Sequence, residues 1–141
     1  MNSSDDVKRF MDACDQKETG FGKQSNLYIA LVREEFDELM NAFFRKNIVD
    51  IADGCADLKW VIEGLEHTLK IPQQDVWNEV ARSNLAKIDD ETGKVLKRAD
   101  GKVLKPEGWT PPDIKSILGK VVKPEGWTSP DNKSILKNNK E

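Results

Sequence analysis

The chain has 141 residues, of which 38% are hydrophobic and 33% are charged, so it has room for one domain with a modest core and a tail. Its net charge of −3 is uneven, because residues 1–92 hold 11 basic and 19 acidic side chains whereas residues 93–141 hold 11 basic and 6 acidic ones. The acidic front argues against nucleic-acid binding, since phosphates would be repelled, and is compatible with divalent cations.

Membrane-spanning and secreted proteins are disfavoured by the sequence. No apolar run approaches the roughly 18 residues that a membrane span needs, and the polar, acidic N-terminus is unlike a secretory signal. Cys14 and Cys55 form neither a CxxC pair nor a disulfide framework. Cys55 lies within an apolar helical pattern, which predicts a small buried side chain. We therefore expect a reduced, cytoplasmic protein.

The first two predicted helices occupy the N-terminal third of the chain. One begins at Ser3, where cap residues precede first-turn acids, and ends near Lys17. The next runs from Ser25 to about Arg45. Its apolar side chains recur every three or four residues, which predicts a continuous row along one face. These side chains are Ile29, Val32, Phe36, Leu39 and Phe43.

Two more helices are predicted over residues 48–69 and 73–88, the latter starting after Pro72 because proline is favoured near a helix start. The apolar row of the third helix consists of Ile51, Cys55, Leu58, Ile62 and Leu65. The second and third helices are joined by a short connection and should pack antiparallel. The expected fold is all-α, a four-helix-type bundle over residues 1–92.

The tail contains an internal repeat. Residues 101–118 read GKVLKPEGWTPPDIKSIL and residues 119–136 read GKVVKPEGWTSPDNKSIL, so 15 of 18 positions are identical. Two copies are too few for a solenoid, and the prolines predict extended segments rather than helices. We expect residues 93–118 to wrap the bundle with Trp109 as an anchor, and residues 119–141 to form a duplicated basic tail that is loosely ordered.

The residues most informative about function are acids on the two long helices. The second helix has three such glutamates: Glu34, Glu35 and Glu38. Glu35 lies three residues and Glu34 four residues before Glu38, and both spacings place the paired side chains on one helical face. Three aspartates of the third helix fall within roughly 60° of one another: Asp50, Asp53 and Asp57. Each acidic row lies beside its apolar row. If the apolar rows pack together, the acidic rows face each other, and such like charges persist when a cation lies between them.

The alternative is that the acids are solvated surface with Lys and Arg partners, which is the usual role of acid-rich helix faces. Cations close in sequence are few, namely Arg33, Arg45 and Lys59. The residues alone leave a metal site and a solvated face equally open. Oxygen-only ligands favour Mg²⁺, Mn²⁺ or Ca²⁺ over zinc or copper. His67, the only histidine, lies well beyond the acids, which weakens a di-iron site.

Three segments carry a resemblance to a known family: EEFDEL, DGCADLKWVIEG and EVARSNLAK. Together they resemble the MazG-like all-alpha NTP pyrophosphohydrolase superfamily, and most closely its phosphoribosyl-ATP pyrophosphohydrolase-like branch of phages and bacteria, over about residues 25–114. The motif of the superfamily is EExxE, a spacer and ExxD. The three glutamates match its first half, and Asp57 matches the final Asp. The sequence departs at Gly54, where the motif has Glu, and Asp53 is the expected substitute.

The resemblance implies hydrolysis of a (d)NTP to the (d)NMP and pyrophosphate with roughly two or three Mg²⁺ per site, for which Mn²⁺ can substitute. The implied metal ligands are Glu34, Glu35, Glu38, Asp53 and Asp57, with Asp50 ranked last. The three glutamates are also the implied catalytic residues, since one of them would orient or deprotonate water.

Arg82, Asn84 and Lys87 resemble the SNxxK segment of the family, which implies substrate binding by a donor–acceptor amide and point charges. Asn26 is a further candidate beside the base. The alternative is that Asn84 caps a helix end and Lys87 is solvated. The resemblance also implies a homodimer or homotetramer, a nucleotide substrate, and no nucleic-acid or membrane partner. Relatives from phages act on dGTP, which brings dGTP or GTP into consideration and would place the protein in a host cytoplasm.

The predicted function is nucleotide-pool control by a (d)NTP pyrophosphohydrolase, and two alternative functions remain open. One is a non-catalytic helical interaction protein whose acid rows are only surface. The other is a hydrolase of the same superfamily that acts on a different substrate, such as phosphoribosyl-ATP.

Overall fold

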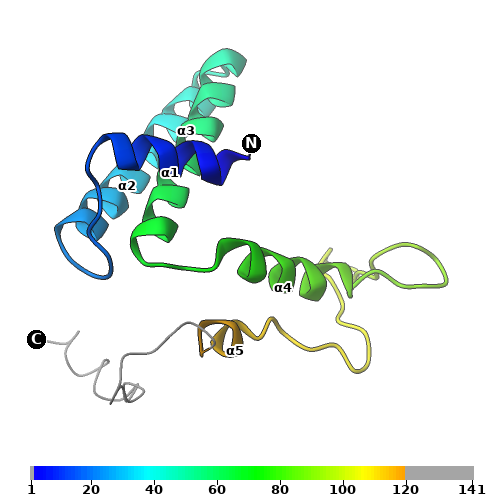
Figure 1. Cartoon of the computed structure of the whole chain (residues 1–141). Coiled ribbons are helices and arrows are strands. Elements are labelled where there is room, and N and C mark those ends of the chain that lie inside the picture. The colour runs from blue at the N-terminus through cyan, green and yellow to red at the C-terminus, as the bar shows by residue number, and fades with distance from the viewer. Residues whose placement is uncertain (1, 120–141) are drawn as a thin grey trace, which may run out of the picture.

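A computed structural model describes residues 2–119 of the chain (Figure 1). Its helices are α1 (Ser3–Ala13), α2 (Lys23–Phe44), α3 (Ile48–Thr68), α4 (Gln73–Leu85) and α5 (Ile114–Gly119). The expected all-α class is confirmed. No helix in this part of the chain combines the length and apolar character of a membrane span.

The helix ends follow from local capping. The side chain of Asn2, rather than Ser3 or Ser4, caps α1 by accepting a hydrogen bond from the backbone N–H of Asp5 at 3.0 Å. Asn47 caps α3 in the same way, with 3.1 Å to the N–H of Asp50. The first helix ends at Ala13, four residues before the predicted end, because the backbone of Asp15 turns into the left-handed region with φ 55°.

The helical pair α2 and α3 forms the centre of the molecule, and α1 packs across α3. The buried side chains of this core are Val7, Met11, Tyr28 and Val61. Two small residues of α3 let the helices approach closely. A Cβ atom added to Gly64 would lie 2.0 Å from Cε1 of Tyr28, so the tyrosine ring fills the space that any side chain there would need.

Polar contacts fasten α1 to the C-terminal half of α3. The hydroxyl of Ser3 donates to Glu63 Oε1 at 2.6 Å, and the hydroxyl of Ser4 lies 3.1 Å from Nε2 of His67. His67 is therefore committed to packing between the two helices, at the end of α3 remote from the aspartates.

The buried faces of α2 and α3 are rotated relative to the predicted apolar rows. On α2, Ile29, Phe36 and Phe43 are 54%, 49% and 62% exposed. The prediction that Cys55 is buried is wrong, since this thiol is exposed. The helices meet instead through rows that include the buried Ala42 and Gly54, because small residues allow the closer approach of the two backbones.

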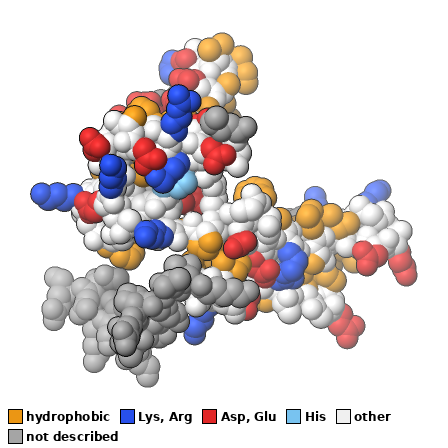
Figure 2. All heavy atoms as spheres, in the orientation of Figure 1, with side chains coloured by type: hydrophobic (Ala, Val, Ile, Leu, Met, Phe, Trp, Pro, Cys, Tyr) orange, Lys and Arg blue, Asp and Glu red, His pale blue; other side chains and the backbone are white. Residues whose placement is uncertain are grey.

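The fourth helix extends away from the other three (Figure 1). Among residues 2–119 the main helix contacts join α2 with α3, α1 with α3, and α4 with α5. Trp77 and Leu85 are 68% and 63% exposed, and Figure 2 shows hydrophobic side chains gathered along this extension. The bundle of the single chain is therefore made by α1, α2 and α3, while α4 carries an apolar surface of its own.

The segment after α4 turns back along that helix. Isolated antiparallel bridges join Ile88 with Val95 and Lys97 with Val103. The prediction that the repeat contains no helix is wrong for its end, because α5 begins directly after the prolines, and the N–H of Ser116 donates to Asp113 Oδ1 at 3.1 Å. The predicted loose tail falls almost wholly on residues 120–141, which lie outside the described residues.

Candidate active site

An acidic pocket of about 290 Å³ opens between α2 and α3. Its lining residues are Glu38, Asn41, Ala42, Arg45, Asp50, Asp53, Gly54 and Asp57. The structure thus brings Glu38 of the first predicted acidic row to the same place as the three aspartates of the second, whereas Glu34 and Glu35 do not line this pocket. Asn41 was not singled out in the sequence and Arg45 was considered only as a nearby cation, although their spacing of three and seven residues from Glu38 puts them on the same helical face.

Glu35 lies one turn before Glu38 at the inner edge of this acidic cluster. Burial raises the pKa of its carboxyl group, and the neighbouring Glu38, Asp57 and Glu34 raise it further by charge repulsion. The Oε2 atom of Glu35 is buried and has no hydrogen-bond partner. A carboxylate in this position is unfavourable in the absence of a positive charge, and a bound cation would relieve both the repulsion and the unpaired oxygen.

The donor set fits a hard cation. Carboxylate and amide oxygens are the ligands that Mg²⁺ and Mn²⁺ prefer, and the orphaned oxygen of Glu35 points to a missing partner. Within residues 2–119, however, no three His, Cys, Asp or Glu side chains are arranged closely enough to hold one ion together. Closure around a cation therefore requires rotamer changes, which the exposed side chains of Glu38 and Asp53 can make without repacking the core.

Asp50 is held at the rim of the pocket. The guanidinium of Arg45 lies 3.2 Å from Asp50 Oδ2. The other two aspartates of the pocket, Asp53 and Asp57, form no ion pair with another described residue. The ranking of Asp57 and Asp53 above Asp50 as metal ligands stays a prediction.

The predicted substrate residues of α4 are not brought to the acids within this single chain. Arg82 donates to Glu79 at 2.9 Å, and the ammonium of Lys87 donates to Asn84 Oδ1 at 3.0 Å. Asn26, in the first turn of α2 and exposed, does not line the acidic pocket either.

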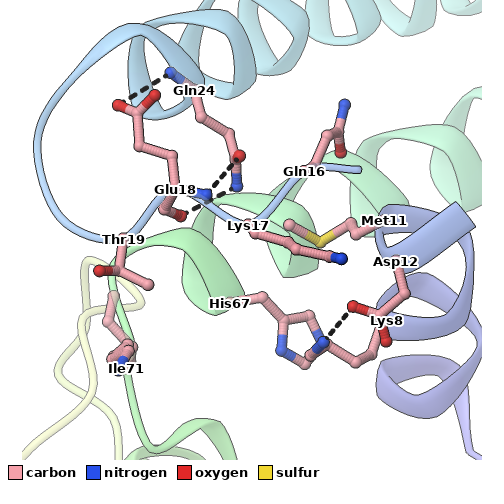
Figure 3. A pocket seen from close by; sticks show the side chains of 11 residues that line it. Lys8, Met11, Asp12, Gln16, Lys17, Glu18, Thr19, Gln24, His67 and Ile71 are labelled. Carbon is pink, nitrogen blue, oxygen red and sulfur yellow. Dashed lines mark hydrogen bonds and ion pairs between the residues drawn. The ribbon is translucent and has the colours of Figure 1, made fainter. Parts of the chain in front are cut away.

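A second pocket, of about 380 Å³, lies between α1, the loop before α2 and the end of α3 (Figure 3). It holds Lys8, Lys17, Lys70 and His67 but none of the clustered acids. Gln24 crosses it, donating to Thr68 Oγ1 at 2.9 Å. These bonds hold the loop against α3 and do not form a cation site.

One comparison with known proteins identifies a family for the chain. The family model described as phosphoribosyl-ATP pyrophosphohydrolase matches residues 7–84, which is more than half of the chain and a range that includes the acidic pocket. The chain belongs to the phosphoribosyl-ATP pyrophosphohydrolase family. The resemblance to the MazG-like all-alpha superfamily is thereby confirmed. No curated protein matches the chain at a significant level. As a member of this family the protein is a hydrolase, a pyrophosphohydrolase acting on a nucleotide substrate.

The departure from the family motif at Gly54 has a structural basis. A Cβ atom at Gly54 would lie 3.3 Å from Cα, Cβ and Cδ1 of Leu39, so α2 approaches α3 where the motif has a glutamate. Asp53, one residue earlier, lines the same pocket. A close helix contact thus replaces one family carboxylate, and a neighbouring carboxylate remains within the pocket.

Proposed function

We propose that the protein is a Mg²⁺-dependent nucleoside triphosphate pyrophosphohydrolase that converts a (d)NTP to the (d)NMP and pyrophosphate in nucleotide-pool control. The observation that carries the proposal is the partly buried carboxylate of Glu35, with an unpaired oxygen, beside Glu38 and Asp57. Such a group costs stability in the free protein and gains a partner when a cation binds.

The residues of the site would have two roles, metal binding and proton transfer. Glu38, Asp53 and Asp57 would hold the metal, together with Glu34 and Glu35. When bound, Mg²⁺ neutralises the triphosphate and makes a water molecule more acidic. Water adds to the α-phosphorus, the bond to the bridging oxygen of the β-phosphate breaks, and pyrophosphate leaves. Glu34 or Glu35 accepts the proton that the water releases, so positioning and charge stabilisation suffice and no protein nucleophile is needed.

Phosphoribosyl-ATP is the second candidate substrate, because the matched family carries its name. It presents the same triphosphate to the acids, so the acidic pocket accommodates both chemistries. The choice of base, including a guanine preference, depends on residues that contact the nucleoside, for which Asn26 and Asn84 are the candidates.

We infer that the active assembly is a homodimer or homotetramer. An apolar groove of about 750 Å³ on α2 and α3 is lined mainly by hydrophobic side chains that include Ile29, Phe36 and Ile62. The apolar surface of α4 also lacks a partner among α1, α2 and α3 of its own chain. A second copy of the chain would cover both surfaces.

The direct test is to incubate the protein with Mg²⁺ and a panel of nucleotides that includes each dNTP, each NTP and phosphoribosyl-ATP, and to measure pyrophosphate and the monophosphate product. We expect turnover that chelation with EDTA abolishes. Glu38→Gln should remove turnover and weaken Mg²⁺ binding while the helical circular dichroism is kept. Glu91→Gln, in an exposed turn, is the matched control. Folded wild-type protein that releases no pyrophosphate from any nucleotide would overturn the proposal.

A further inference from the structure

The first copy of the tail repeat binds α4 through Trp109. The indole N–H donates to the backbone carbonyl of Ser83 at 2.7 Å, and Ser83 is buried. The ammonium groups of Lys87 and Lys105 lie 5.2 Å and 4.7 Å from the centroid of the indole ring. One residue of the tail thus combines a partly buried hydrogen bond with two cation–π contacts.

The contacts beyond Trp109 use mainly the backbone of the tail. Arg82 donates to the carbonyls of Thr110 and Pro111 at 3.4 Å and 3.3 Å. Glu79 accepts from the backbone N–H of Asp113 at 3.0 Å. Backbone carbonyl and N–H groups do not depend on the side chain that a residue carries. A tail segment with a different sequence could therefore make the same contacts with Arg82 and Glu79.

The second copy of the repeat has the same residue types at the positions whose side chains contact the α4 region or cap α5 in the first copy. Lys123 and Trp127 correspond to Lys105 and Trp109, and the aspartate and serine that cap α5 recur as Asp131 and Ser134. The three differences place Val122, Ser129 and Asn132 where the first copy has Leu104, Pro111 and Ile114.

Only one of these differences weakens the docked contacts. Pro111 contributes its carbonyl, which Ser129 also has. Leu104 is 42% exposed, and its N–H, which donates to the carbonyl of Leu96, is a backbone group that Val122 also has. Ile114, by contrast, is half-buried in α5, so Asn132 would bury less apolar surface.

We propose that α4 is a docking surface for which the two repeat copies of the same chain compete, with residues 119–136 able to replace residues 101–118. Sharing one chain gives the second copy a high effective concentration. Trp109 lies about 22 residues after Lys87 in the sequence, and Trp127 lies about 40 residues after it. Because the entropy cost of closing a loop grows slowly with its length, the shorter loop favours docking of the first copy by only about two- to threefold. The substitution of Ile114 by Asn132 adds to that preference.

The test uses the full-length protein and three variants: Trp109→Ala, Trp127→Ala and the double variant. Hydrogen exchange of the α4 amides reports docking, and exchange in α1–α3 reports folding, since the main contacts of α5 are with α4 and not with α1, α2 or α3. Trp127→Ala should match the wild type. Trp109→Ala should exchange about tenfold faster, and the double variant at least about tenfold faster again, because only then is no anchor left.

Two further measurements identify the occupant. Asn132→Ile in the Trp109→Ala background should slow α4 exchange, because the second copy regains the apolar contact. The indole N–H of Trp127 should become protected in Trp109→Ala at every protein concentration. Equal exchange in Trp109→Ala and the double variant would overturn the proposal. So would protection that grows with protein concentration, since the second copy would then be docking on another chain.

Discussion

The seam between α2 and α3 and the surface of α4 both carry clustered charged side chains, but the two regions differ in whether those side chains have interaction partners. At the seam, Glu35 has a buried oxygen with no partner beside two further carboxylates. On α4, Arg82 and Lys87 are both engaged, one by Glu79 and tail carbonyls and the other by Asn84 and Trp109. The unpaired oxygen of Glu35 lies in the region for which we propose a cation, whereas the engaged side chains of α4 lie in the region that holds the first copy of the repeat.

The largest effect is expected from a comparison of two aspartate substitutions in the acidic pocket. Asp57→Asn should lower turnover at least about a hundredfold, because this carboxylate interacts with Glu35 and forms no ion pair with another described residue. Asp50→Asn should change turnover by less than about threefold, because Arg45 already holds that side chain at the rim. Steady-state kinetics on the preferred nucleotide measures both, and equal losses would place Asp50 among the metal ligands.

The close packing of the bundle can be broken at Gly64. Gly64→Ala should destabilise the protein by about 1–3 kcal/mol, because its Cβ would overlap the ring of Tyr28. Gly54→Ala is the matched comparison, since its Cβ would meet Leu39 at 3.3 Å and needs only a small shift. Urea unfolding followed by circular dichroism gives both free energies. A Gly64→Ala protein as stable as the wild type would contradict the packing described for the bundle.

A smaller effect is expected when the charge of Glu35 is removed. Glu35→Gln should raise the Tm of the metal-free protein by roughly one to three degrees, because it relieves repulsion with Glu38 and Asp57. The same change should abolish most of the stabilisation that Mg²⁺ gives the wild type. Thermal unfolding with and without Mg²⁺ measures the two effects. A Glu35→Gln variant that gains as much from Mg²⁺ as the wild type would remove Glu35 from the cation site.

The smallest effect concerns the pH dependence of stability at Glu66, outside the acidic pocket. Burial and the charge of Glu63 raise the pKa of this carboxyl group, and His67 opposes them. The folded state therefore binds the proton more tightly than the unfolded chain, so this stabilisation is present at low pH and is lost as pH rises through the folded pKa. Glu66→Gln should leave the Tm unchanged near pH 4 and raise it slightly at pH 7, and a Tm difference that is constant with pH would contradict this.

The sequence predicted the helices well, because caps and apolar spacing are local properties. It also predicted that the glutamates of α2 and the aspartates of α3 would face each other, since helical spacing alone places them on single faces. It did not predict the rotation of the buried faces, which depends on how closely Gly54 and Gly64 let the helices approach. The sequence also did not predict the position of α4, because the contacts of α4 with the tail depend on tertiary structure and not on the residue pattern of that helix.

The tight fit of Gly54 against Leu39 imposes an order on mutational change. A glutamate introduced at position 54 would have to displace the backbone and side chain of Leu39, which lie 3.3 Å from its Cβ. Shortening Leu39 would remove only its Cδ1 atom from this contact, because the Cα and Cβ atoms of Leu39 also lie 3.3 Å away and would remain. A carboxylate at position 54 can therefore follow only a change that moves the backbones of α2 and α3 apart, and a change of Leu39 alone does not supply that room.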